Sequence, residues 1–219
     1  MADLVYNCCV LWNSDCIFKF QNDPDFIDGE GANDLKQSRA VSFRNWQGDR
    51  LPAAAFPKRL FGLPLETDFG EAETYNELPN LIWSIAVLVS RQAADIIEGF
   101  NLGFGALYPI ELIYHDGKTP MEGEYFVLNF GNAISGYLPS QSPVTNVNQW
   151  ALGYFTVPNP NLDYNIALSS KVLLGSDIWV DPNLQDVFFV RGGLAEALIA
   201  AGMQNDFQFR RCKIVDNVR

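Results

Sequence analysis

The stretch "AADIIEGFN" at residues 93–101 has a counterpart 101 residues later in "LAEALIAAG" at residues 194–202. A short hydrophobic run precedes each copy, "AVLVSRQ" before the first and "VFFVRGG" before the second. In both copies apolar residues recur at i, i+3, i+4 and i+7, which is the spacing of one helix face. The sequence therefore predicts the same strand-then-helix unit twice. The predicted faces are Ala93, Ile96, Ile97 and Phe100 in the first copy and Leu194, Ala197, Leu198 and Ala201 in the second.

Each predicted helix is followed by a closing residue and a returning strand. We expect Asn101 to close the first helix in the left-handed conformation and Gly202 to close the second. Beyond the first, "ALYPIELIYH" and "EYFVLNF" flank the turn "DGK" and predict a hairpin, and "DFQFRRCKI" returns after the second. Every repeated position is apolar or a cap. The repeat is therefore architectural, and its two helices are expected to dock on a shared sheet.

The remaining segments complete an α+β prediction. We expect one domain over residues 1–219: a mainly antiparallel sheet with two pseudo-repeated strand-helix-strand units, whose short helices pack on the sheet. Residues 1–60 would supply N-terminal strands and an acidic loop, and 61–219 the rest. Further strands are predicted at "LVYNCCVLW", "CIFKF", "AVSFRNW", "KVLL" and "DIWV", a solvated loop at "QNDPDFIDGEGANDLKQS", and an extended wrap over 51–77.

Composition excludes several functional classes. With 15 basic and 26 acidic residues the formal net charge is −11, which disfavours nucleic-acid binding. The longest apolar run, "LIWSIAVLV", is far shorter than the ~20 residues of a membrane-spanning helix. No basic leader precedes an apolar run, so we expect a cytoplasmic protein with reduced thiols. In a strand, Cys8 and Cys9 would point to opposite faces and could not share a metal.

Motifs for catalysis or cofactors are weak. The single histidine, His115, follows the strand "ALYPIELIY" and reads as a surface residue beside a turn. Counted from Asp23, a helix-loop-helix calcium loop would need an oxygen ligand and then glycine where Ile27 and Asp28 stand. Gly103 and Gly105 follow a helix, whereas a dinucleotide fingerprint must open one. We therefore predict no catalytic residue, metal or cofactor, although a distant carboxylate pair would leave no local mark.

Two acidic stretches are the candidate partner-binding surfaces. Carboxylates mixed with aromatic residues pair with the Lys and Arg groups of a basic partner, and exposed polar loops are the alternative explanation. The polar, aromatic loop from Tyr137 to Trp150 has the same ambiguity. The candidates are Asp23, Asp25, Asp28 and Glu30 in "DPDFIDGE", and Asp68, Glu71, Glu73 and Glu77 in "ETDFGEAETYNE", which also holds Glu66.

The order of four phrases resembles the eleventh immunity-protein family of bacterial polymorphic toxin systems. These phrases are "LPNLIW", "VLVSRQAADIIEGF", "PIELIYHDGK…EGEYFVLNF" and "DVFFVRGGLAEALIAAGMQNDFQFRRC", which together span roughly Gly62 to Cys212. The resemblance implies a cytoplasmic antidote that binds a co-encoded toxin. Where the family has Glu after "VS" and opens the second helix with "SER", this sequence has Arg91 and "RGG", so no functional residue is carried over.

Three hypotheses follow. In the first, the chain binds and neutralises a cognate toxin, encoded by a neighbouring gene, by occluding it without catalysis. In the second, it is a small cytoplasmic hydrolase that uses carboxylates and His115. In the third, it is a structural module that self-associates into a homo-oligomer through its sheet edges.

Overall fold

The computed structural model describes residues 4–10, 20–22, 34–63, 65–66, 72–73, 78–142, 146–147, 154–157 and 160–216. One sheet contains β2 (Phe20–Asn22), β3 (Arg59–Gly62), β6 (Leu81–Trp83), β7 (Val87–Ser90), β8 (Ala106–Ile113) and β9 (Tyr125–Asn129). A second sheet contains β1 (Val5–Cys9), β13 (Ile178–Val180), β14 (Val187–Arg191) and β15 (Arg210–Arg211). The α-helices are α1 (Asp34–Trp46), α2 (Arg91–Glu98), α3 (Gly192–Ala200) and α4 (Gln204–Phe207). The shorter pairs are β4 (Leu65–Glu66) with β5 (Ala72–Glu73), β10 (Asn146–Val147) with β11 (Phe155–Thr156), and β12 (Ala167–Ser169) with β16 (Lys213–Val215).

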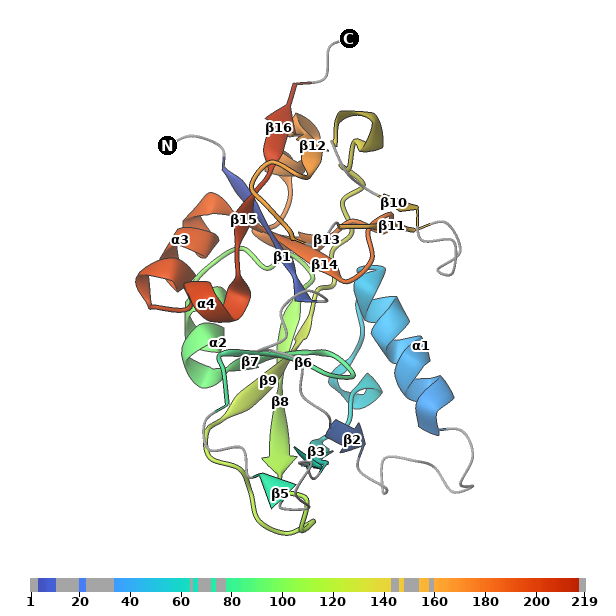
Figure 1. Ribbon diagram of the computed structural model, residues 1–219, viewed down its shortest axis with the longest axis vertical. Helices are drawn as coiled ribbons and strands as arrows, with labels where there is room; N and C mark the ends of the chain where they lie inside the picture. The colour runs from blue at the N-terminus through green and yellow to red at the C-terminus, as the bar shows by residue number, and fades with distance from the viewer. Residues whose placement is uncertain are drawn as a thin grey trace.

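The two larger sheets lie one above the other along the long axis of the molecule. Their strand orders are β2-β3-β8-β9-β7-β6 and β13-β14-β1-β15. In Figure 1 the six-stranded sheet is below, with α1 on one side of the molecule and α2, α3 and α4 on the other. Most strand pairs are antiparallel, and β3·β8 and β12·β16 are parallel. This arrangement confirms the predicted α+β class.

The repeat predicted from the sequence is present in the structure. Helix α2 buries Ala93, Ala94 and Ile97, and helix α3 buries the three residues that lie 101 positions further on, Leu194, Ala195 and Leu198. The hairpin of β6 and β7 before α2 matches the hairpin of β13 and β14 before α3. The parallel pairs match as well. The pairing of β8 with β3 begins at Glu111, and the pairing of β16 with β12 begins at Lys213, 102 positions later.

One strand of the second unit comes from the opposite end of the chain. We name β3, β6, β7, α2, β8 and β9 the first unit, and β12, β13, β14, α3, β15, β16 and β1 the second unit. In the first unit β9 lies between β7 and β8, and in the second β1 lies between β14 and β15. All four pairings are antiparallel. The second unit is thus a circular permutation of the first, in which the N-terminal strand replaces β9.

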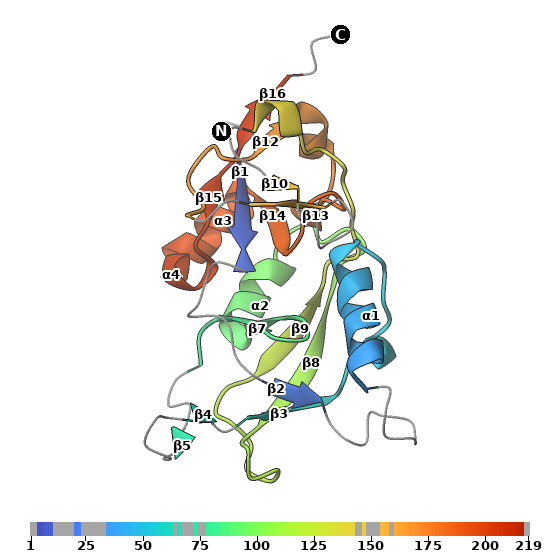
Figure 2. The same cartoon turned by 45° about the vertical axis from the view of Figure 1, so that its right-hand side comes forward.

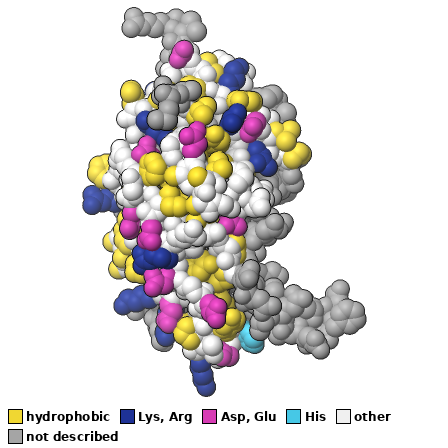
Figure 3. Space-filling model, turned by 90° about the vertical axis from the view of Figure 1, so that its left-hand side faces the viewer, with side chains coloured by type: hydrophobic (Ala, Val, Ile, Leu, Met, Phe, Trp, Pro, Cys, Tyr) yellow, Lys and Arg dark blue, Asp and Glu magenta, His cyan; other side chains and the backbone are white. Residues whose placement is uncertain are grey.

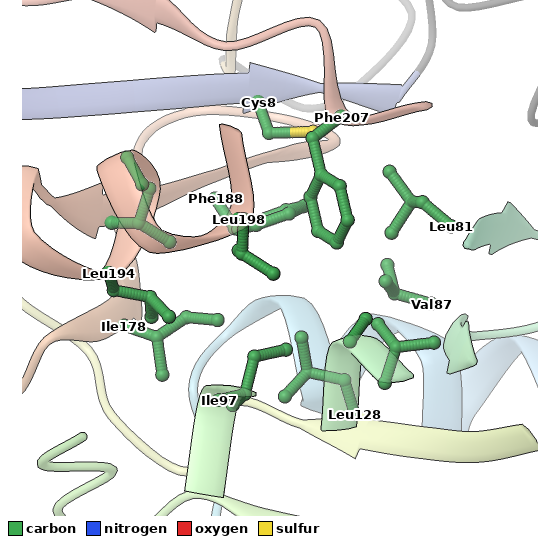
Figure 4. Packing of buried hydrophobic residues seen from close by; sticks show 14 of the residues in the cluster. Cys8, Leu81, Val87, Ile97, Leu128, Ile178, Phe188, Leu194, Leu198 and Phe207 are labelled. Atoms are coloured by element: carbon green, nitrogen blue, oxygen red, sulfur yellow. The ribbon is translucent and has the colours of Figure 1, made fainter. Parts of the chain in front are cut away.

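The expectation that both helices dock on one shared sheet is wrong. Strand β7 belongs to the six-stranded sheet and β14 to the four-stranded sheet, so each unit has a sheet of its own. The inner faces of both sheets and the helices α2 and α3 instead enclose one common hydrophobic cluster. Figure 4 shows Ile97 and Leu128 of the first unit pointing toward Leu198 and Phe188 of the second. The apolar stripes cover each other across the interface between the units.

Polar contacts between the units replace one predicted cap. Helix α2 ends at Glu98 with Gly99 in right-handed conformation, and the expectation of a left-handed Asn101 is wrong. The Asn101 N–H instead donates to Asp177 Oδ2 at 2.8 Å, and the Asp177 N–H donates to the Asn101 carbonyl at 2.7 Å. The second cap is confirmed, because Gly202 has a φ of 87°.

Three other local predictions need correction. Residues 40–46 belong to helix α1 and not to a strand, so the predicted loop over 21–38 also ends in helix. The helix is favoured because it puts Asn45 and Trp46 on one buried side, where Asn45 Nδ2 donates to the Leu128 carbonyl at 3.0 Å. Residues 170–174 form a 3-10 turn, which buries Val172 and leaves Leu174 exposed. The expected wrap over 51–77 contains β3, which is a strand of the main sheet.

A buried amide pair fixes the segment that follows α1. Asn129 Nδ2 donates to Asn45 Oδ1 at 2.8 Å, and Asn129 Oδ1 accepts from the Leu51 N–H at 3.2 Å. Tyr108 of β8 adds a hydrogen bond from its hydroxyl to the Leu51 carbonyl at 2.7 Å. Figure 2 shows α1 beside β8 and β9. These bonds hold the segment that begins at Leu51 beside β8, where a large groove begins.

Candidate functional site: a groove along the edge of β8

A groove with a volume of about 1140 Å³ runs along β8. One wall is the 3-10 turn at Ala53–Ala55 and the residues after it, and the other is formed by β8 and the end of the β8–β9 hairpin. Its size is above the ~300–1,000 Å³ of typical small-molecule pockets. The groove therefore suits a chain segment better than a compact small molecule.

Aromatic and aliphatic side chains line the groove. Phe56, Ile110 and Tyr125 are buried in the cluster on the outer face of the six-stranded sheet. Phe56 and Tyr108 pack with ring centroids 5.8 Å apart. Such surfaces form the centre of protein interfaces, because aromatic side chains bury a large area at a low cost in conformational entropy.

Charged residues form the rim. Lys58 and Glu111 are exposed, and within the described chain neither has an ion-pair partner. Across the groove Arg91 forms an ion pair with Glu124, whose Oε2 lies 2.8 Å from the Arg91 Nε. It also makes a cation–π contact, with its guanidinium carbon 4.1 Å from the centroid of the Phe126 ring. The hydrogen bond to Glu124 raises the pKa of Arg91, so this cation is permanent. The rim offers charges of both signs.

The most deeply buried carboxylate among the described residues serves the fold. Asp181 is fully buried, and its Oδ2 accepts hydrogen bonds of 2.7 Å from the N–H groups of both Gly136 and Tyr137. Its Oδ1 accepts from Asn183 at 3.0 Å and 2.8 Å. These four donors satisfy the carboxylate without a cation, and nothing in this arrangement presents a reactive group to solvent.

Among the described residues, His115 is not part of the lining of the groove. It is exposed at the hairpin turn, as predicted, beside Asp116. Hydrogen bonds from Thr119 and Lys118 lower the pKa of Asp116 to about 2, so this carboxylate closes the turn. Within the described ranges, no group of three or more His, Cys, Asp or Glu side chains gathers as metal ligands would.

The cysteines follow the sequence-based expectation. Cys8, Cys9 and Cys212 are buried. Cys8 belongs to the cluster shared by the two units and Cys9 to the cluster on the outer face of the four-stranded sheet, which confirms that they point to opposite faces. Burial raises the pKa of Cys212 to about 12, which keeps its thiol protonated and unreactive.

The acidic candidates lie mostly outside the described residues. One candidate is described, Glu73, which lies in β5. Strand β2 ends at Asn22, directly before the first acidic stretch, and Glu66 at the start of the second lies in β4. The described surface differs from these acidic segments: on the face in Figure 3, acidic and basic side chains are interspersed. The candidates outside the described residues are Asp23, Asp25, Asp28, Glu30, Asp68, Glu71 and Glu77.

Sequence reasoning missed the groove, although one signal was available. Pro109 lies inside the strand predicted at 106–115, and a proline within a strand marks an edge. The groove borders β8 beside that proline. Lys58 and Arg59 gave no comparable signal, because their position across from β8 depends on the parallel pairing of β3 with β8.

The fold and the groove define an α+β protein built from two pseudo-repeated units, with a groove of mixed rim charge along β8. Comparison with protein families makes this more specific. The chain belongs to the Immunity protein family (Imm11), whose model matches residues 20–213. The match begins well before Gly62, where the resemblance identified from the sequence starts, so residues 20–61 also belong to the family region. A search of curated proteins found no match.

None of the helices in the described ranges has the length and apolar content needed to span a bilayer.

Proposed function

We propose that this chain is a cytoplasmic immunity protein that binds one cognate toxin, encoded by a neighbouring gene, and neutralises it by covering its active surface. The observation that carries the proposal is membership of the immunity family over residues 20–213. The open groove with an apolar floor and a charged rim supports it, because this is the composition of a protein-binding surface. Occlusion requires no chemistry, and the buried carboxylate Asp181 is already used by the fold.

The acidic stretches 23–30 and 66–77 are proposed as the surfaces that guide the toxin to the protein. Together they hold nine of the 26 acidic residues and none of the 15 basic residues. The rest of the chain therefore has 17 acidic and 15 basic residues and is nearly neutral. The attachment of both stretches supports a joint role, because β2 precedes the first and pairs with β3, which precedes the second. Concentrated charge of one sign accelerates encounter with a basic partner.

Titration of toxin activity separates occlusion from catalysis. With the C-terminal domain of the toxin encoded beside this gene, an occluding protein should abolish activity at a ratio of one to one and co-purify with the toxin. His115→Ala should neutralise equally well. Protection of a large excess of toxin by a small amount of this chain, lost in His115→Ala, would contradict the proposal and favour the hydrolase.

Charge reversal tests the acidic stretches. Replacing their carboxylates with lysine should slow toxin association at least ~10-fold at low salt, with an unchanged melting temperature. Glu98→Lys and Glu196→Lys, on exposed positions of α2 and α3, are the matched controls and should leave the rate within ~2-fold. An unchanged association rate after reversal of both stretches would remove them from the contact surface.

A further inference from the structure

The two units differ at the strand edge next to the parallel strand pair, which we call the seam. This difference indicates what the groove receives. In the parallel pairs, the Glu111 N–H donates to the Lys58 carbonyl at 2.9 Å and the Lys213 N–H donates to the Ile166 carbonyl at 2.9 Å. Two positions before these donors lie Pro109 in the first unit and Arg211 in the second. Pro109 and Arg211 are therefore equivalent, as are the segments that precede Lys58 and Ile166.

In the second unit the chain itself closes the seam. The Tyr164 N–H donates to the Arg211 carbonyl at 2.7 Å, and the Arg211 N–H donates to Asp163 Oδ1 at 2.8 Å. Residues 163–166 thus lie along the edge of β15 and satisfy both backbone groups of Arg211. The edge that pairs with a neighbouring strand in other sheets is covered here by a turn of the same chain, in which Tyr164 has a φ of 66° and the Asn165 N–H donates to the Leu162 carbonyl at 3.3 Å.

In the first unit the equivalent segment does not reach the strand edge. The Ala55 N–H donates to the Pro52 carbonyl at 2.9 Å, and the Phe56 N–H donates to the Ala53 carbonyl at 3.1 Å. These bonds fold the segment into the 3-10 turn, which forms the far wall of the groove. The groove is therefore the opened counterpart of the seam that residues 163–166 close in the second unit.

The groove exposes a backbone acceptor. Backbone groups alternate in direction along a strand, and the Glu111 N–H points toward β3. The Pro109 carbonyl, two positions earlier, points to the same side and so into the groove. Pro109 has no N–H, so the edge accepts a hydrogen bond at this position but cannot donate one. Ile110, the next residue, pairs with Tyr125 on the other side.

We propose that the groove receives a segment of the toxin, which covers the strand edge beside Pro109 as residues 163–166 cover the edge of β15 in the second unit. A backbone N–H of this segment donates to the Pro109 carbonyl, and an apolar side chain packs against Tyr108 and Ile110. An acidic and a basic side chain of the segment pair with Lys58 and Glu111, the rim charges without ion-pair partners in the described chain. This inference rests on the proposed function, since it names the binding mode of the same partner.

The first test fills the groove and measures affinity for the toxin domain. Ala54 is exposed on the groove wall, and Ala200 is exposed at the end of α3 outside it. Ala54→Trp should weaken toxin binding at least ~10-fold, whereas Ala200→Trp should stay within ~2-fold. Lys58→Glu should weaken binding in the same direction, with Lys171→Glu as its exposed control. Equal affinities in each pair would overturn the inference and leave the proposed function intact.

Hydrogen exchange of the unaltered chain provides the second test and needs no variant. Toxin binding should slow exchange of the Ala54 amide at the groove and leave the Tyr164 amide, already bonded in the second unit, unchanged. Unaltered exchange at the groove in a saturated complex would overturn the inference. A dimer of the chain alone that Ala54→Trp dissolves would assign the groove to self-association and overturn it as well. Failure of the unaltered chain to bind the toxin would overturn the proposed function itself.

Discussion

Asp186 lies in the turn between β13 and β14, with a φ of 54° and only 9% of its surface exposed. Burial raises the pKa of its carboxyl from 3.8 to about 6, and a hydrogen bond with Gln185 opposes the shift. The folded state therefore binds a proton more tightly than the unfolded state. The contribution of Asp186 to stability is therefore highest below pH 4, falls as the pH rises from 4 to 6, and stays reduced above pH 6.

Asp186→Asn should remove this dependence. Asparagine is neutral, has nearly the same shape and tolerates a positive φ, so the variant should gain about 1–3 kcal/mol of unfolding free energy at pH 8. At pH 4 the gain should largely vanish, because the native carboxyl is then protonated. Urea denaturation at both pH values measures the difference.

Asp116 is the control of opposite sign. Its pKa is lowered to about 2, so its stabilisation is present above pH 4 and is lost as the pH falls toward 2. Asp116→Asn should lower stability at pH 8. A gain for both variants, or an equal gain for Asp186→Asn at both pH values, would contradict the assignment of the shift to burial.

At the scale of elements, α3 ends in a motif that needs glycine. The Gly202 N–H donates to the Ile199 carbonyl at 2.9 Å, and the Met203 N–H donates to the Leu198 carbonyl at 3.1 Å. This pair of bonds is the Schellman motif, and it requires the left-handed conformation that Gly202 adopts at a φ of 87°. At the other end of α3, Gly193 has helical geometry, and a β-carbon there would meet only Phe100 Cε1 at 3.4 Å.

Two glycine-to-alanine changes in this one helix should therefore have opposite effects. Gly202→Ala should destabilise the protein by about 1 kcal/mol, since the left-handed conformation is strained with a β-carbon. Gly193→Ala should stabilise it by about 0.5–1 kcal/mol, because alanine is the better helix former. Thermal unfolding measures both, and a shift of the same sign in both variants would contradict the cap assignment.

The elements that sequence reasoning predicted correctly are those whose signal is local. The periodicity of Ala93 and Ile97, and of Leu194 and Leu198, identified α2 and α3 because their own faces carry the pattern. Residues 40–46 were wrongly predicted as a strand because "AVSFRNW" alternates like one. The helix is instead favoured by a distant contact, the hydrogen bond from Asn45 to the Leu128 carbonyl. Such a contact cannot be inferred from a local pattern.

At the scale of the whole molecule, the difference between local patterns and long-range contacts explains which features could not be predicted from the sequence. The pairing of β1 with β14 joins Val5 to Arg191, and nothing in the "LVYNCCVLW" phrase indicates so distant a partner. The circular permutation and the open seam beside Pro109 both depend on such long-range pairing. The acidic candidates were visible in the sequence by their charge alone, but charge gives no position on the folded surface.

The shared core makes cooperative unfolding the expected behaviour of the two units. Ile97 and Leu198 occupy equivalent positions on α2 and α3, are no more than 1% exposed, and lie in one cluster with residues of both sheets. A cavity on either side removes contacts from both units. We therefore propose that the chain behaves as a single domain, as the sequence predicts, although its architecture is duplicated.

Ile97→Ala and Leu198→Ala should each lower the unfolding free energy by about 2–5 kcal/mol. Each variant should shift the whole transition, followed at once by tryptophan fluorescence and circular dichroism, without splitting it in two. Lys171→Ala, on the exposed side of the second unit, is the control and should change stability by less than about 0.5 kcal/mol. Two separate transitions, each moved by only one of the core variants, would show that the units are independent domains joined by the chain.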